Sequence, residues 1–350
     1  GSSLNLIGGD TAPERNVISG NSDSGILITG TSLQNRIAGN YIGTNPAGGA
    51  SILNDSGAPI HTYGVQLSGN AFNNTVGSGG TFTDPGANVI SGNDLGIGVN
   101  NIAAGPDNGT RNLIQGNLIG VTPEGTAAAS NAEYGIFVNN SPYTLVQSNL
   151  TSANEIAGIG IFGNGATHVT VVANVVGPDL FGRPVFQSAA GRVPGAQLYG
   201  VVVIGASSNT IGTSNAGNLI SGNSSVGVYI SRQDFFGNTY SIPTNNLVFG
   251  NTITQNRQYG ILFYNAPSNV APPFTGSGRQ AISRRRRAGS NTNIVFGNRV
   301  SFLNYVTQVN GNSRLRRSPR RQVKPASQVK PHAHLQAQAK PIRVIMPKHS

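Results

Sequence analysis

Ionisable side chains that could perform catalysis are few in this chain, and they are scattered. A glycoside hydrolase needs two facing carboxylates, and a calcium-dependent lyase needs several carboxylates on the ion. No two acids are neighbours in the sequence, and no tight acidic cluster is evident. The twelve acids are Asp10, Glu14, Asp23, Asp55, Asp84, Asp94, Asp107, Glu124, Glu133, Glu155, Asp179 and Asp234.

One segment, residues 178–198, places an acid beside two arginines. Asp179, Arg183 and Arg192 are the residues in question. An arginine can act as the base of a β-elimination, so these three residues are candidates for binding or processing an acidic sugar. The simpler interpretation, which we prefer, is a salt bridge or a solvated loop.

Metal and proton-transfer sites find little support in the sequence. Cysteine is absent, which excludes disulfides and thiolate metal sites. His61 lies near Asp55 in the loop 44–62, where a proton relay is conceivable, whereas His168 begins an expected strand and is predicted to be structural. We therefore predict no metal site and no cofactor, with calcium only under a lyase activity.

Four tyrosines recur at one position of a repeated phrase. Tyr63, Tyr134, Tyr199 and Tyr259 each precede the glycine of a Gly-[Ile/Val] segment. With three coils of a solenoid between successive tyrosines, they would lie about 14 Å apart along one face. Such a row suits a sugar polymer, because the ring stacks on a pyranose and the hydroxyl forms hydrogen bonds. Alternatively, each tyrosine covers the turn beside its loop.

The strands and turns that position these residues are encoded by a repeated sequence phrase, Asn-x-[Ile/Val]-x-Gly-Asn. It predicts a turn, a short strand and another turn. Asparagine and glycine tolerate left-handed backbone angles, and stacked asparagines can hydrogen-bond from coil to coil. The copies are "NVISGN" at 16 and 88, "NRIAGN" at 35, "NLIQGN" at 112, "NLISGN" at 218, "NLVFGN" at 246 and "NIVFGN" at 293.

Two further phrases accompany the first, Gly-[Ile/Val]-x-apolar and Asn-x-[Ile/Val]-Gly. Examples are "GILI" at 25, "GIFV" at 135 and "NLIG" at 117. Their alternation is typical of very short strands with one buried face. The phrases recur at about 71 residues, which we interpret as three units of 19–28 residues. Repeats of this length without helical spacing predict a solenoid.

These phrases resemble those of right-handed parallel β-helix repeat proteins of the pectate-lyase-like superfamily, especially large secreted bacterial repeat proteins. The resemblance covers roughly residues 4–305. It implies an all-β, right-handed parallel β-helix, which we expect to contain ten to twelve coils. Long insertions at 44–62, 121–133 and 178–198 each rejoin the repeat near a tyrosine and are expected to project from one face.

Charge divides the chain into two parts. Residues 1–278 contain seven arginines, no lysine and all twelve acids, whereas residues 279–350 contain the other 16 basic residues and no acid. We predict a β-helix over residues 1–312, interrupted by an Arg-rich loop at 266–290, and a disordered basic tail over residues 313–350. The tail is expected to bind polyanions in a salt-dependent manner.

The sequence is compatible with two functions. The first is a non-catalytic extracellular or cell-surface scaffold or adhesin that contacts polysaccharide through its loop-bearing, tyrosine-bearing face. The second is a polysaccharide lyase or glycoside hydrolase acting on an acidic glycan. The chain starts inside a repeat and shows no signal peptide, so we expect a piece of a longer or processed protein, and the localisation rests on the resemblance. The sequence contains no run of about 18 apolar residues, so we expect no transmembrane helix.

Overall fold

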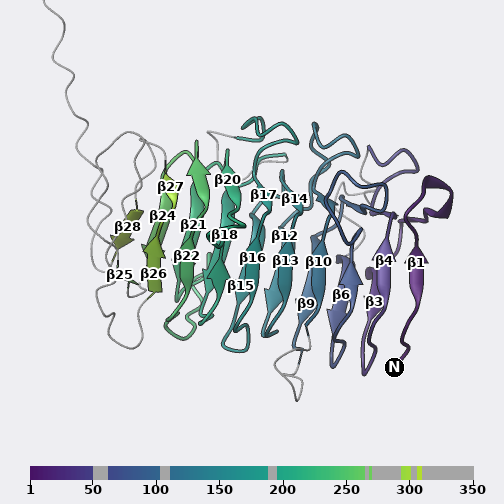
Figure 1. Ribbon diagram of the computed structural model, residues 1–350, viewed down its shortest axis with the longest axis horizontal. Coiled ribbons are helices and arrows are strands. Elements are labelled where there is room, and N and C mark those ends of the chain that lie inside the picture. The colour runs from purple at the N-terminus through teal and green to yellow at the C-terminus, as the bar shows by residue number, and fades with distance from the viewer. Residues whose placement is uncertain are drawn as a thin grey trace, which may run out of the picture. The chain divides into compact units, whose positions relative to one another are not determined.

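The computed structural model describes residues 1–49, 62–102, 111–187, 195–264, 268–269, 293–300 and 306–309, which all belong to one compact unit, Gly1–Ser313. These residues form a right-handed parallel β-helix with three parallel sheets (Figure 1), which confirms the predicted fold class. The basic tail and almost all of the Arg-rich segment lie outside the described residues.

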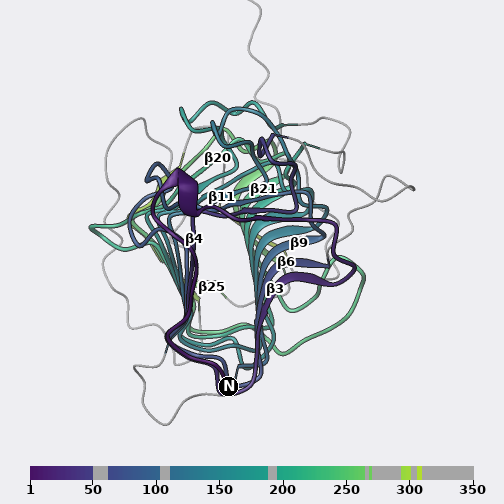
Figure 2. The same ribbon diagram turned by 90° about the vertical axis from the view of Figure 1, so that its right-hand side faces the viewer.

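The three sheets form three walls when viewed along the solenoid, with β4 and β25 in one, β11 and β20 in the second, and β3, β6 and β9 in the third (Figure 2). We name them sheets A, B and C. Sheet A contains, in order, β1 Leu6–Gly8, β4 Arg36–Ala38, β7 Thr75–Val76, β10 Leu113–Gln115, β13 Leu145–Gln147, β16 Thr170–Val172, β19 Thr210–Ile211, β22 Leu247–Phe249, β26 Asn293–Phe296 and β25 Ser268–Asn269. Sheet B contains β2 Val17–Ile18, β5 Tyr41–Ile42, β8 Val89–Ile90, β11 Leu118–Ile119, β14 Leu150–Thr151, β17 Val175–Val176, β20 Leu219–Ser221, β23 Thr252–Thr254 and β27 Arg299–Val300. Sheet C contains β3 Ser24–Ile28, β6 Tyr63–Ser68, β9 Leu95–Asn100, β12 Tyr134–Asn139, β15 Ala157–Phe162, β18 Tyr199–Ile204, β21 Val226–Ser231, β24 Tyr259–Tyr264 and β28 Val306–Val309.

Each coil passes through sheets A, B and C in turn. Sheets B and C hold nine strands each, so the described part of the chain makes nine coils. The register corrects the predicted super-repeat. Val17 pairs with Tyr41, and Tyr41 pairs with Val89, so the 72 residues from Val17 to Val89 span two coils. The prediction of three was wrong because alternate coils carry insertions that lengthen them at the corners.

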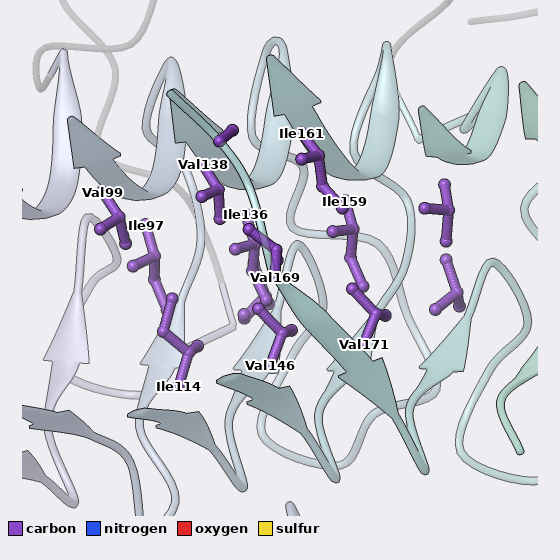
Figure 3. Packing of buried hydrophobic residues seen from close by; sticks show 14 of the residues in the cluster. Ile97, Val99, Ile114, Ile136, Val138, Val146, Ile159, Ile161, Val169 and Val171 are labelled. Carbon is purple, nitrogen blue, oxygen red and sulfur yellow. The ribbon is translucent and has the colours of Figure 1, made fainter. Parts of the chain in front are cut away.

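The interior is a continuous column of isoleucine and valine. Ile37, Ile42 and Ile97 are fully buried, as are their counterparts in the following coil, Val76, Ile90 and Ile136. Figure 3 shows Ile97, Ile136 and Ile159 from sheet C facing residues of sheet A such as Ile114 and Val146. Burying one such side chain contributes roughly 1.5–3 kcal/mol, and the repetition of this gain along the axis stabilises the solenoid.

Asparagine ladders run along the corners, as the repeated phrase predicts. At the corner between sheets A and B, each side-chain amide donates to the Oδ1 atom of the next asparagine, at 2.8 to 3.2 Å. This ladder joins Asn16, Asn40, Asn88, Asn117, Asn149, Asn174, Asn218, Asn251 and Asn298. Shorter ladders occupy the other two corners, for example Asn93 to Asn131 at 3.1 Å and Asn209 to Asn246 at 3.1 Å.

The residue before a ladder asparagine is often left-handed, which explains the Gly-Asn pair in the phrase. Gly116, before Asn117, has φ of 69°. Ala173, before Asn174, has φ of 55° even though it carries a Cβ. Left-handed angles cost an L-residue roughly 1–2 kcal/mol, so glycine is the favoured residue at these corners.

Candidate functional site

Three long insertions leave sheet B and rejoin sheet C at the same corner, in alternate coils. Their described parts near sheet B, residues 44–49, 121–130 and 178–187, are here called the loop roof. The roof is packed onto the outer face of sheet B, where Leu118, Val121, Leu150 and Phe186 are buried in one cluster. The insertions therefore serve first as a cover for an apolar sheet face.

Hydrogen bonds hold the roof down. The N–H group of Leu180 donates to the carbonyl of Gly125 at 2.9 Å, which joins two roof segments. Serine hydroxyls of the intervening coils donate to roof carbonyls, Ser91 to Val121 at 3.0 Å and Ser152 to Pro178 at 2.6 Å. This role accounts for the serine in both copies of "NVISGN", since Ser19 donates in the same way to the carbonyl of Thr44. Below the third insertion the serine, Ser152, comes from "NLTSAN".

The predicted acid and arginine in the third insertion are tied to one another. Asp179 is fully buried and accepts hydrogen bonds from the backbone N–H groups of Phe181 at 3.0 Å and Arg183 at 2.8 Å. The Arg183 guanidinium binds the same carboxylate at 2.6 Å and lies 5.1 Å from the Phe181 ring. Both groups thus stabilise a roof turn, in agreement with the salt-bridge interpretation. Arg192 lies outside the described residues.

The four predicted tyrosines lie in one row on the outer face of sheet C. The register runs from Tyr134 through Ala157 to Tyr199, and from there through Val226 to Tyr259. Successive tyrosines are therefore two coils apart, about 9.6 Å, instead of the expected 14 Å. Strands β3 to β24 of this sheet contain no charged residue.

The environments of these tyrosines differ. Tyr134 is only 5% exposed, with its ring 5.0 Å from Phe137 and 5.6 Å from Phe162, and burial raises the pKa of its hydroxyl. Its ring faces are closed to a ligand. Tyr63 is half-buried and lies over Gly98, where a side chain would collide with the ring. These contacts favour a covering role at both positions.

A continuous group of rings lies on β18, β21, β24 and the loop after β21. We call Tyr199, Tyr229, Phe235, Tyr259 and Tyr264 the aromatic patch. The ring centroids of Tyr199 and Tyr229 are 5.5 Å apart, and those of Tyr229 and Tyr264 are 6.5 Å apart. All five side chains are half-buried. Burial raises the pKa of Tyr229 to about 12, so its hydroxyl remains a neutral donor and acceptor at physiological pH.

Asp94 and Glu133, which are far apart in the sequence, stand on adjacent coils. The backbone N–H of Glu133 donates to the carbonyl of Asp94 at 2.8 Å. Burial raises the pKa of Asp94. The sequence contained a signal for this pair, because each acid directly precedes the first strand residue of "LGIG" or "YGIF". Equivalent positions in a repeat become neighbours once coils stack.

Other candidate groups do not assemble into a metal centre. Among the described residues, no three His, Asp or Glu side chains come together in a way that could hold a metal ion. His168 stacks on Tyr143, with ring centroids 4.9 Å apart, which fits its predicted structural role. His61 and Asp55 lie outside the described residues.

Comparisons with known proteins add no evidence on the function of the chain. No protein-family model, curated protein or solved structure matches the chain. None of the described helices is long and apolar enough to span a membrane.

Proposed function

We propose that the protein is a non-catalytic extracellular or cell-surface scaffold of the pectate-lyase-like superfamily that contacts polysaccharide through the outer face of sheet C. The observation that carries the proposal is the aromatic patch. It places four tyrosines together on the outer face of a sheet whose strands β18, β21 and β24 carry no charged residue, and Phe235 of the loop after β21 packs against them. A contiguous group of partly exposed aromatic rings on the outer face of a sheet is unfavourable in water and is typical of a binding surface.

The chemistry of the patch suits sugars. A tyrosine ring stacks on the apolar face of a pyranose while the hydroxyl hydrogen-bonds to the polar edge. The β-helix holds these rings on neighbouring strands, so little conformational entropy is lost on binding. The localisation and the superfamily assignment rest on the repeated phrases and the coil architecture.

The basic segment 313–350 adds a second contact in this proposal. Its charge suits acidic polysaccharide or another surface polyanion. Deleting residues 313–350 should weaken retention on a polyanion column at low salt and leave the sugar contacts of the β-helix unchanged. Retention that does not respond to salt would contradict an electrostatic contact.

A glycan array with matched variants tests the main proposal. Tyr259→Ala removes a half-buried ring of the aromatic patch, whereas Tyr143→Ala removes a tyrosine that stacks on His168 at another corner. We expect Tyr259→Ala to lose most of the array signal and Tyr143→Ala to retain it. Equal binding by both variants, or no binding by the unmodified protein, would reject the sugar-binding face.

The adjacent acids Asp94 and Glu133 favour a second candidate, a glycoside hydrolase or lyase. Their backbones are hydrogen-bonded across adjacent coils and burial raises the pKa of Asp94, and glycoside cleavage uses two carboxyl groups of which the general acid has a raised pKa. Product release from a panel of uronate and neutral polymers tests it, measured as reducing ends and as absorbance of unsaturated uronates, with and without calcium. Activity that is lost in Asp94→Asn and Glu133→Gln would replace the scaffold proposal.

A further inference from the structure

A small hairpin after β21 lies over the outer face of sheet C. It spans Arg232–Tyr240, and Gln233 and Thr239 form an antiparallel bridge within it. The backbone N–H of Tyr240 donates to the carbonyl of Arg232 at 2.7 Å, which closes the base of the hairpin. In Figure 2 it belongs to the green loop that bulges outside the wall of β3, β6 and β9.

The carboxylate of Asp234 fixes the tip of the hairpin. It accepts hydrogen bonds from the backbone N–H groups of Phe236 at 2.9 Å and Asn238 at 2.8 Å. The side-chain amide of Asn238 at 2.7 Å and the hydroxyl of Tyr240 at 3.2 Å complete its partners. The tip is therefore held in one conformation, which determines where its two phenylalanines point.

One of these phenylalanines stacks within the aromatic patch. The Phe235 ring is parallel to that of Tyr199, with a centroid distance of 4.5 Å and an interplanar angle of 16°. It also lies 5.7 Å from Tyr229. Its neighbour Phe236 points away and is 75% exposed. The stacked ring covers a tyrosine in the manner that a pyranose would.

A second turn of the same design shows what is particular here. Asp179 organises the roof turn through the backbone N–H groups two and four residues later, as Asp234 does. In that turn the residue after the aspartate is Leu180, which packs on the aliphatic outer face of sheet B. The corresponding residue in the hairpin is Phe235. A flat ring thus replaces the aliphatic side chain where the sheet below presents flat rings.

We propose that Phe235 is an internal occupant of a sugar-binding site formed by Tyr199 and Tyr229, and that a sugar ring of the polysaccharide displaces it. This inference rests on the proposed function, because it specifies how the aromatic patch receives its ligand. The hairpin is then an autoinhibitory contact. Binding includes the loss of one ring stack, and removing that ring raises affinity.

Isothermal titration with two probes, cellohexaose and hexagalacturonate, tests the inference. Phe235→Ala removes the occupant, and Asp234→Asn loosens the hairpin while keeping every ring, which provides a second route should the first variant fold poorly. Phe236→Ala is the matched control, since it deletes a neighbouring ring that does not stack on the patch. We expect both test variants to bind about fivefold to tenfold more tightly than the unmodified protein, and the control to match it.

A change in sugar affinity in the opposite direction is equally informative. Weaker or unchanged binding by Phe235→Ala and Asp234→Asn would show that Phe235 belongs to the binding platform or is unrelated to it, which overturns the inference and leaves the proposed function standing. Failure of both probes to bind any of the four proteins would reject the sugar-binding face itself, and the inference with it.

Discussion

The outer faces of sheets B and C receive different covers, although both belong to the same coils. Sheet B presents aliphatic side chains such as Leu118 and Leu150, and the loop roof buries them almost completely. Sheet C presents the aromatic patch, whose rings stay half-buried beneath one short hairpin. The comparison teaches that long loops on a solenoid are not by themselves a binding site. Here they close one face, and the face that they leave open carries the rings.

Truncation of a leucine under the roof should give the largest effect. Leu150 is fully buried on the outer face of sheet B, so Leu150→Ala should lower the free energy of unfolding by about 3 kcal/mol. Leu27 on the outer face of sheet C is 51% exposed, and Leu27→Ala should change it by less than about 0.5 kcal/mol. Urea unfolding measures both. Equal losses would show that the two faces are covered alike.

The roof anchor comes next. Asp179→Asn weakens a buried acceptor that serves two backbone N–H groups and Arg183, and it should cost about 2 kcal/mol in urea unfolding. Glu124→Gln changes an exposed roof acid and serves as the control, with no expected effect. If Asp179→Asn is as stable as the control, the turn does not depend on this carboxylate.

A substitution at a corner of the coils lies on neither outer face. It therefore provides a reference for these changes in the free energy of unfolding. Ala173 is exposed and has φ of 55°, so Ala173→Gly should raise the free energy of unfolding by about 1 kcal/mol. The same unfolding assay applies. A loss of stability would mean that the methyl group makes contacts which outweigh the strain.

The hairpin anchor should give the smallest effect, and it should depend on pH. Burial acts to raise the pKa of Asp234, but hydrogen bonds from Asn238, Phe236 and Tyr240 outweigh it and leave the pKa below its ordinary value. The stabilisation is therefore complete above the ordinary aspartate pKa of about 3.9 and is lost as pH falls through the lower folded value. The measurement is Tm between about pH 5 and pH 2. The decline should be shallower in Asp234→Asn, and identical slopes would contradict this assignment.

The sequence sufficed to predict the fold because the fold is repetitive. Each Asn-x-[Ile/Val]-x-Gly-Asn phrase reports a ladder asparagine, an inward aliphatic residue and a left-handed corner, and all three occur at Asn112–Asn117. The row of tyrosines was predicted for the same reason. Its spacing was not, because the number of coils in a super-repeat depends on insertions that the phrases do not count.

The finer features of the candidate site depend on contacts between segments that no periodicity encodes. Phe235 reaches Tyr199 because a single hairpin folds back across two coils. The closed environment of Tyr134 comes from Phe137, whose neighbours in the adjacent coils are Gly98 and Gly160, and from Phe162, which stands where the adjacent coils have Asn139 and Ile204. Asp94 and Glu133 occupy equivalent positions in the repeat. Their adjacency could be recognised only once the register had placed these two coils side by side.

Nitration of tyrosines by tetranitromethane, located by mass spectrometry with and without cellohexaose or hexagalacturonate, tests the contrast between the two faces most directly. Tyr41 lies under cover on the outer face of sheet B, 8% exposed and with the Arg15 guanidinium 4.1 Å from its ring. We predict that Tyr259 and Tyr264 react and are protected by the hexasaccharide that binds, while Tyr41 stays unreactive throughout. Reaction of Tyr41 at the rate of Tyr259, or a patch whose reactivity neither hexasaccharide changes, would contradict the account.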